Sequence, residues 1–336
     1  MTRLAPLLLF GGLALVPAFG DAPTLTLVAR GMIYALAATS LGFILGPGGL
    51  VSFGHAAAMG IGAYAVGIAM EEGTRDALLA FPLAMAAAGV FALVTGAVSL
   101  KTRGVYFIMI TLAFGQMAFF VAQSLSAYGG DDGLSLAARS TVAGRRWLKD
   151  PATFHFVVLG LLAATVLACR MLARSPFGRV LSAGKQNERR LRALGVDPYP
   201  YRLVAFAIAG ALAGLSGALY ANLTEFVSPA YLSWHRSAEL IVMVVAGGAG
   251  TVLGPVAGAL GVVLVEEGLS RLTEHWRILF GPLLVLLVLG RGGLASPMKS
   301  LRGGLASPTK GLRGGLAAVA GKVRGLAALM GGRRDG

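Results

Sequence analysis

The stretch SPFGRVLSAGKQNERRLRALGVDPYPYRL, Ser175 to Leu203, is a polar, basic segment between two apolar runs. These runs, residues 154–172 and 203–223, are each long enough to cross the roughly 30 Å hydrocarbon core of a bilayer as a helix. Within the polar segment, apolar residues recur at helical spacing and basic residues surround them. The stretch therefore predicts two membrane helices joined by an amphipathic segment that docks a partner in the aqueous phase. A simple basic loop that obeys the positive-inside rule is the alternative.

The amino-acid composition indicates that apolar, membrane-compatible sequence makes up most of the chain. Of the 336 residues, 56% are hydrophobic and 13% are charged, whereas soluble domains carry about 25% charged residues. The apolar runs are near-continuous and rich in Leu, Ala, Val and Gly, without the two-residue alternation of a membrane β-barrel. We therefore expect an all-α polytopic membrane protein with about nine or ten transmembrane or re-entrant helices and no soluble domain.

Predicted membrane segments fill most of residues 1–290, which we expect to form one transmembrane domain. The first follows Arg3 and resembles a signal peptide, but we expect it to be retained because the rest of the chain inserts in any case. The predicted spans are residues 4–20, 25–45, 50–70, 78–100, 105–127, 154–172, 203–223, a broken stretch at 238–265, and 278–289.

The distribution of charge predicts the orientation. Basic turns at residues 101–103 and 170–192 should face the cytoplasm, and the more acidic turns near residues 71–76 and 128–150 should lie outside. Both termini are then cytoplasmic, provided that the broken stretch crosses twice or not at all. Its centre, GGAGTVLGP at residues 247–255, interrupts any helix, so we expect a hairpin or re-entrant pair there.

A second broken element, GPGGLVSFGHAAAMGIGAYAVGI, occupies residues 46–68. Interrupted hydrophobic segments in corresponding places of two halves indicate a substrate path. Candidate path residues are Ser52, Gly54, His55, Tyr64, Gln116, Gly248 and Gly250. Close helix packing and interhelical hydrogen bonding are the alternative explanations for these residue types. Four acidic residues fall near predicted helix ends, where we expect them to be interfacial: Glu225, Glu239, Glu266 and Glu267.

The sequence carries no signature of covalent chemistry or of a metal centre. Cys169, the single cysteine, lies in an apolar run and is expected to be a packing residue, and the four histidines lack ligand spacing. No P-loop, GxSxG or HExxH motif occurs. We therefore expect neither an enzyme nor a cofactor-binding or metal-binding protein.

The sequence after Leu289 is basic and repetitive. Arg291, Arg302, Arg313 and Arg324 recur at a period of 11, and residues 291–336 contain nine Lys or Arg and one Asp, a net +8 of the chain's +14. Glycine pairs and two prolines disfavour a stable helix. We expect a low-complexity cytoplasmic tail, either a neutral expansion or a segment that binds anionic lipid, with no role for nucleic acid.

Six ordered stretches carry a resemblance to a known family, over roughly residues 25–294. They are GGLVSFGHAAAMGIGAY (48–64), KTRGVYFIMITLAFGQM (101–117), GGDDGL (129–134), the polar segment that begins at Ser175, AGALAGLSGALYA (209–221) and GGAGTVLGPVAGA (247–259). Together they make the chain similar to the permease subunits of branched-chain amino acid ABC transporters, of the LivM type.

The resemblance implies an ATP-driven importer of leucine, isoleucine and valine in the cell inner membrane. This chain would form half of the translocation path, as a heterodimer with a second homologous permease. Two ABC ATPase subunits would bind beneath the bilayer, and an extracytoplasmic substrate-binding protein would deliver the substrate.

By position, residues 174–197 correspond to the family's cytoplasmic coupling helix. The residues implied in ATPase docking are Phe177, Arg179, Glu188, Arg189, Arg190 and Leu194. The chain departs from the family pattern at GKQN, residues 184–187, where a more apolar run is expected, and in its tail.

Three other functions fit the same sequence. A permease of a related urea or amide importer would share the architecture. An ATP-independent secondary transporter normally places a charged residue deep in a span, and we find no convincing example here. A structural membrane scaffold is the third.

Overall fold

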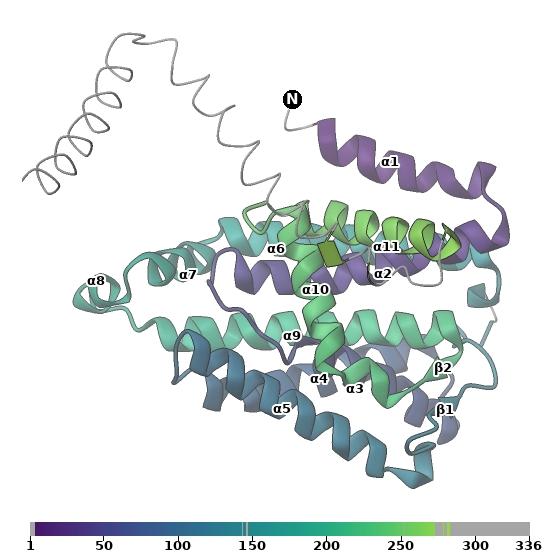
Figure 1. Cartoon of the computed structure of the whole chain (residues 1–336), viewed down its shortest axis with the longest axis horizontal. Helices are drawn as coiled ribbons and strands as arrows, with labels where there is room; N and C mark the ends of the chain where they lie inside the picture. The colour runs from purple at the N-terminus through teal and green to yellow at the C-terminus, as the bar shows by residue number, and fades with distance from the viewer. Residues whose placement is uncertain are drawn as a thin grey trace, which may run out of the picture. The chain divides into compact units, whose positions relative to one another are not determined.

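The structure is a computed structural model that describes residues 4–142, 144, 145, 147–251, 253–272, 278, 281 and 282. These residues are mostly helical, with very little strand (Figure 1), which confirms the all-α class predicted from the sequence. The predicted span at 278–289 lies outside the described residues except for Ile278, Gly281 and Pro282, and the tail at 291–336 lies wholly outside them.

In this part of the chain the α-helices are α1 (Leu4–Phe19), α2 (Ala22–Leu45), α3 (His55–Glu71), α4 (Ala77–Ser99), α5 (Val105–Ser124), α6 (Pro151–Arg174), α7 (Pro176–Gln186), α8 (Glu188–Ala193), α9 (Pro198–Thr224), α10 (Trp234–Gly247) and α11 (Gly254–Leu272). Short 3-10 turns are η1 (Ser126–Tyr128), η2 (Trp147–Lys149) and η3 (Pro229–Leu232). The strands β1 (Leu134–Ser135) and β2 (Phe226–Val227) pair antiparallel, with Leu134 opposite Val227.

Five helices are long and apolar enough to cross a bilayer: α2, α4, α5, α6 and α9. Most of α2 and α9 is buried within the protein, whereas only a minority of the residues of α4, α5 and α6 is buried. Because the exposed positions carry large apolar side chains such as Leu79, Phe120 and Leu167, these three helices present surfaces suited to lipid or to another membrane helix. The chain is therefore a multi-pass membrane protein with α2 and α9 near its centre.

Acidic or amide side chains begin several of these helices. Asp76, Asp150 and Asp197 precede α4, α6 and α9, and each accepts a hydrogen bond from a backbone N–H of the first turn. This satisfies a donor that has no partner within the helix. The Thr153 hydroxyl and backbone N–H, which both donate to Asp150, hold the pKa of that carboxyl below its usual value.

Contacts that only glycine permits join α9 to α3. A Cβ on Gly217 would meet the Met59 carbonyl oxygen, and a Cβ on Gly62 would meet the Gly214 backbone. Small residues let membrane helices approach closely enough for their backbones to touch. The glycines predicted to favour close helix packing therefore lie in the contact between these two helices.

Both predicted interruptions are present. The expected span at residues 50–70 begins later than predicted, at His55, because the chain from Gly46 to Gly54 has no helix and Gly49 has a φ of +67°. At the second break the chain turns at Gly248, whose φ is +99°, and α10 and α11 contact each other through their glycines; we call this pair the α10–α11 hairpin. With 14 residues, α10 rises about 21 Å, so it is shorter than a roughly 30 Å bilayer core.

Candidate functional site

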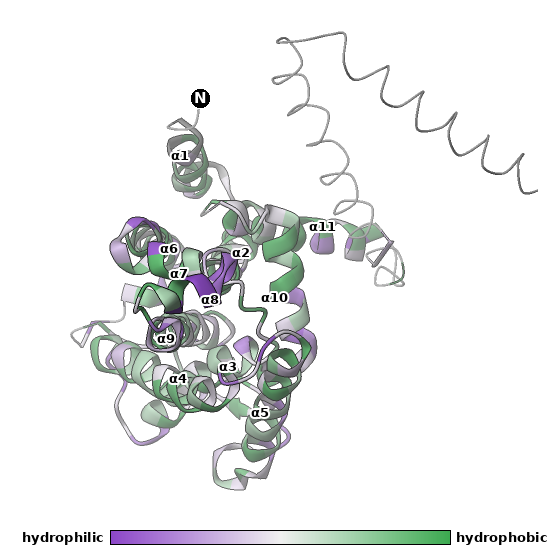
Figure 2. Cartoon of the chain, turned by 90° about the vertical axis from the view of Figure 1, so that its left-hand side faces the viewer, coloured by the Kyte–Doolittle hydropathy of each residue, from purple (hydrophilic) through white to green (hydrophobic). Residues whose placement is uncertain are grey.

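The polar segment that begins at Ser175 folds as two short helices, α7 and α8, between α6 and α9. Figure 2 views the molecule from this end and shows the hydrophilic residues of α8 among helices that are mostly hydrophobic. Asn187 separates the two helices: its extended backbone ends α7, and its Oδ1 accepts a hydrogen bond of 3.0 Å from the Arg190 N–H of α8. The GKQN departure therefore contains a helix cap.

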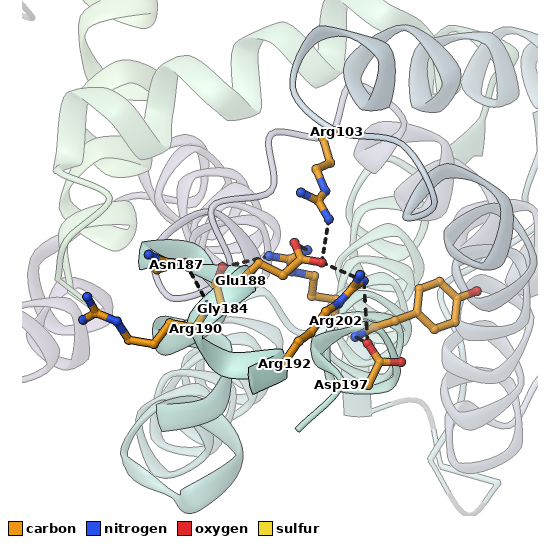
Figure 3. Close-up of polar contacts among 9 residues, drawn as sticks. Arg103, Gly184, Asn187, Glu188, Arg190, Arg192, Asp197 and Arg202 are labelled. Carbon is orange, nitrogen blue, oxygen red and sulfur yellow. Dashed lines mark hydrogen bonds and ion pairs between the residues drawn. The ribbon is translucent and has the colours of Figure 1, made fainter. Parts of the chain in front are cut away.

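Glu188 lies at the centre of an ion-pair cluster (Figure 3). Its Oε1 accepts from Arg103 at 2.7 Å and from Arg192 at 2.8 Å, and its Oε2 accepts from Arg202 at 2.9 Å. Arg103 belongs to the turn between α4 and α5, Arg192 to α8 and Arg202 to α9. These four residues, which we call the Glu188 cluster, therefore attach α8 to two other parts of the fold.

The centre of the Glu188 cluster is largely removed from solvent. The Glu188 side chain is 11% exposed and that of Arg202 is 13% exposed. Arg202 also donates to the Gly184 carbonyl oxygen of α7 at 3.1 Å. A second tie runs from Lys185 of α7, whose Nζ donates to the Gly46 carbonyl oxygen at 2.8 Å. Helices α7 and α8 are thus fixed to α9, to the α4–α5 turn and to the end of α2.

The structure separates the predicted docking residues into two groups. Glu188 faces inward and holds the segment in place, while Phe177 is half-buried against the ring of Tyr201, with centroids 5.8 Å apart. The other four are exposed: Arg179, Arg189, Arg190 and Leu194. Leu194 is 75% exposed, so the apolar stripe predicted for this segment ends at Leu191, which is buried.

Three predicted path residues gather where α3 begins. His55 Nε2 lies 2.8 Å from the Ser40 Oγ of α2, and both side chains are buried. Ser52 Oγ accepts from the Gly54 N–H at 3.3 Å. A Cβ on Gly54 would meet the Thr111 carbonyl oxygen of α5 at 2.6 Å. A cavity of about 10 Å³ beside Gly54 and His55 has room for roughly one water, so an amino acid does not fit there in this conformation.

The other predicted path residues lie elsewhere. Tyr64 is nine residues farther along α3, about 13 Å away, and packs with Leu232 and Tyr231. Gln116 is half-buried on α5. Gly248 and Gly250 lie in the α10–α11 turn, and a Cβ on either would meet no atom within 4 Å. The structure therefore does not bring the seven residues into one site.

Two ion pairs that involve α10 and α11 were not predicted. Arg236 and Glu239 of α10 pair at 2.8 Å, and Arg30 of α2 and Glu266 of α11 pair at 3.7 Å. The Arg236 guanidinium also lies 5.9 Å from the centroid of the Tyr34 ring. The sequence placed both acids at helix ends without partners. The three-residue spacing of Arg236 and Glu239 on one helix is the signal that predicts the first pair.

Ser237 of α10 supports the start of α3 and gives a first testable prediction. Its Oγ accepts from the buried Ala56 N–H at 3.1 Å. We expect Ser237→Ala to lower the free energy of unfolding by about 1 kcal/mol, because this donor loses its partner. Thermal unfolding of the purified chain measures the effect. Ser270→Ala, which removes an exposed hydroxyl bonded within its own helix, is the control; equal unfolding temperatures for both variants contradict the prediction.

Comparisons with known proteins find similar membrane transport proteins. The family described as the permease component of the branched-chain amino acid transport system matches residues 24–288. The chain is 29% identical over 303 residues to the high-affinity branched-chain amino acid transport system permease protein LivM of Escherichia coli (strain K12), covering 83% of this chain and 70% of that protein. No solved structure gives a significant match.

More distant similarities follow the same pattern. The chain is 27% identical over 272 residues to the probable branched-chain amino acid transport permease protein LivM of Methanocaldococcus jannaschii, covering 70% of this chain and 77% of that protein. It is 29% identical over 151 residues to the autoinducer 2 import system permease protein LsrC of Photorhabdus laumondii, covering 42% of this chain and 45% of that protein. All of these relatives are named as permeases.

Proposed function

This chain belongs to the family of permease components of branched-chain amino acid transport systems, and from that premise we propose that it is the membrane subunit of an ATP-driven importer of leucine, isoleucine and valine. It would act in the cell inner membrane with both termini in the cytoplasm. A second, homologous permease would complete the translocation path. Two ABC ATPase subunits would supply the chemistry of ATP hydrolysis, and an extracytoplasmic binding protein would deliver the substrate.

The observation that carries this proposal is the way α7 and α8 are held. The Glu188 cluster and Lys185 tie these helices to α9, to the α4–α5 turn and to α2. A segment fixed at several points transmits a push as rigid-body motion of the bundle to which it is attached. The exposed basic residues Arg179, Arg189 and Arg190 would contact the ATPase.

In this proposal the substrate crosses beside the two broken elements. The chain between α2 and α3 and the α10–α11 turn interrupt the helices in the two halves of the chain, and such interruptions are typical of transporter substrate sites. No amino acid fits beside His55 in this conformation, so passage past His55 would require helices to move. ATPase closure, received at α7 and α8, would supply that motion.

Reversing charge on α8 tests the proposal. We expect Arg189→Glu combined with Arg190→Glu to reduce ATP-dependent leucine uptake at least about tenfold, because two exposed cations at the docking surface become anions that repel an acidic partner surface. The measurement is labelled leucine uptake in cells that lack the gene and express each variant, with binding of the ATPase to the purified permease. The control variant, Arg145→Glu with Lys149→Glu, reverses two exposed charges outside α7 and α8.

The outcomes separate the candidate functions. Wild-type uptake and ATPase binding in the α8 double variant contradict the docking assignment. Uptake that follows an ion gradient and survives ATP depletion indicates a secondary transporter. Absence of leucine uptake with ATP-dependent uptake of urea or an amide indicates the related importer class.

A further inference from the structure

A groove of about 360 Å³ opens beside the Glu188 cluster. Its walls come from the chain between α2 and α3, the α4–α5 turn with the start of α5, the adjoining ends of α7 and α8, and the first turns of α9. Small-molecule sites in proteins typically have volumes of about 300–1,000 Å³. The groove therefore has the size of a site for a small molecule, and neither the proposed docking surface nor the His55 region uses it.

One wall of the groove is charged. Arg103, Lys185 and Arg202 line it together with a single carboxylate, Glu188. Arg192 pairs with both Glu188 and Asp197, so these four cations lie near two carboxylates, and an excess of positive charge is left for a ligand carboxylate. The Arg202 Nε is buried and has no hydrogen-bond partner within the described part of the chain. Lys185 donates to one carbonyl, which leaves two of its three N–H donors free.

The same wall also retains an acceptor. Glu188 accepts from Arg103, Arg192 and Arg202. A carboxylate has about four acceptor positions, so one remains for a ligand N–H. The wall is thus complementary to a molecule that carries both a carboxylate and an ammonium group.

The other large side chains that line the groove are apolar. They are Leu50, Val51, Leu100, Phe107 and Ile108. Leu100 and Phe107 are buried, and the other three are half-buried. Burying a branched aliphatic side chain against such a surface removes apolar area from water and so favours binding. The groove therefore combines the polar complement of an amino acid backbone with a surface for an apolar side chain.

We propose that this groove is a binding site for a zwitterionic α-amino acid with an apolar side chain, at the end of the bundle that carries α7 and α8. The carboxylate would lie at Arg103 and Lys185, the ammonium group at Glu188, and the side chain against Phe107 and Ile108. The chemical class of this ligand rests on the proposed function. Because the ligand would contact the residues that hold α7 and α8, its occupancy would be sensed by the docking segment.

Binding of labelled leucine to the purified full chain, in nanodiscs of neutral lipid, tests the site directly. Ile108→Trp fills the groove, and Lys185→Met removes a cation from its charged wall. We expect each variant to bind leucine at least about tenfold more weakly, since a charge-assisted contact or the cavity itself is lost. Two controls leave the lining unchanged: Met109→Trp, on the exposed face of the same helix, and Arg174→Met, an exposed cation at the end of α6.

Analogues identify the groups that are recognised. Leucinol lacks the carboxylate and 4-methylpentanoate lacks the ammonium group, so we expect both to compete more weakly than isoleucine or valine. Equal leucine binding by wild type and Ile108→Trp overturns the proposal. So does direct binding of labelled inorganic phosphate or of anionic lipid, abolished by Lys185→Met, in a chain that binds no leucine, because the site would then be one for a phosphate group, free or in a lipid headgroup.

Uptake assays on the same variants separate this site from the proposed function. ATP-dependent leucine uptake by a chain whose purified form binds no leucine overturns the groove and leaves the importer assignment standing. Leucine binding that Ile108→Trp abolishes, in a chain that supports no leucine uptake, supports the groove and contradicts the importer assignment.

Discussion

The Glu188→Gln variant is expected to lose most ATP-dependent leucine uptake while its transmembrane helices remain assembled. Glutamine keeps the size of the side chain but removes the charge shared by three arginines. The free-energy cost of the substitution depends mainly on the pair with Arg202, because the side chains of Arg202 and Glu188 are both largely buried. Removing one member of a buried pair costs about 3–5 kcal/mol. Arg103 and Arg192 are 65% and 56% exposed, and pairs of that kind are worth at most about 1 kcal/mol.

The lost ion pairs hold only the short segment that contains α7 and α8. We therefore expect α7 and α8 to detach locally from the rest of the protein, without global unfolding. Trypsin should then cleave at Arg189 and Arg190 several-fold faster in the variant than in wild type. Arg202→Met should have a similar effect, and combining the two changes should add little, because both remove the same interaction. Glu71→Gln, an exposed acid at the end of α3, is the control. Wild-type cleavage rates in Glu188→Gln would contradict the assigned holding role.

Much of the fold could be predicted because each membrane helix requires a long run of apolar residues, which is visible in the sequence. The apolar run at residues 25–45 lies inside α2, and the run at 203–223 lies inside α9. The run at 78–100 matches α4 to within one residue at each end. The exact starts were harder to predict. Helix α3 begins at His55 because the glycines and proline before it disfavour a helix, and the stripe after Ser175 divides because Asn187 caps a new helix.

Much of the candidate site could not be predicted, because its contacts join residues far apart in the chain. Arg103 and Glu188 are 85 residues apart, and no local pattern indicates that a glutamate in a basic segment faces inward. The sequence also did not indicate which helix each buried face contacts. In α2 almost every residue from Ala29 to Ile44 is buried, so apolar periodicity carries no information about which neighbour each side meets.

The glycines also show that packing contacts cannot be predicted from local sequence. The sequence pointed to Gly248 and Gly250 because they lie in the broken element, yet a Cβ at either would meet nothing within 4 Å. The turn requires Gly248 for its φ of +99°, whereas the glycines that close packing requires are Gly247, Gly254 and Gly258, at the contact between α10 and α11. Sequence shows where a helix is interrupted, but only the packed structure shows which glycine has a backbone against it.

We expect Gly258→Ala to disrupt the α10–α11 hairpin and to be among the most damaging single-methyl changes in this element. The new Cβ would meet the Met243 carbonyl oxygen and would lie 2.6 Å from the Gly247 nitrogen. Neither neighbour is a flexible side chain, so the two helices must separate. Overpacking of this kind costs typically about 1–3 kcal/mol, and contact with backbone places this site at the upper end.

The matched control for this change is Gly261→Ala, on the same helix, where a Cβ would meet nothing within 4 Å. The same methyl group there should leave stability unchanged or raise it, because alanine favours a helix by up to about 1 kcal/mol over glycine. Thermal unfolding and the yield of monodisperse protein in detergent measure both variants; equal behaviour would show that the hairpin is not closely packed at Gly258. Gly250→Ala separates packing from transport, because the methyl group would enter open space. A loss of leucine uptake at wild-type stability would therefore place the α10–α11 turn on the substrate path, whereas retained uptake would limit its role to reversing the chain between two tightly packed helices.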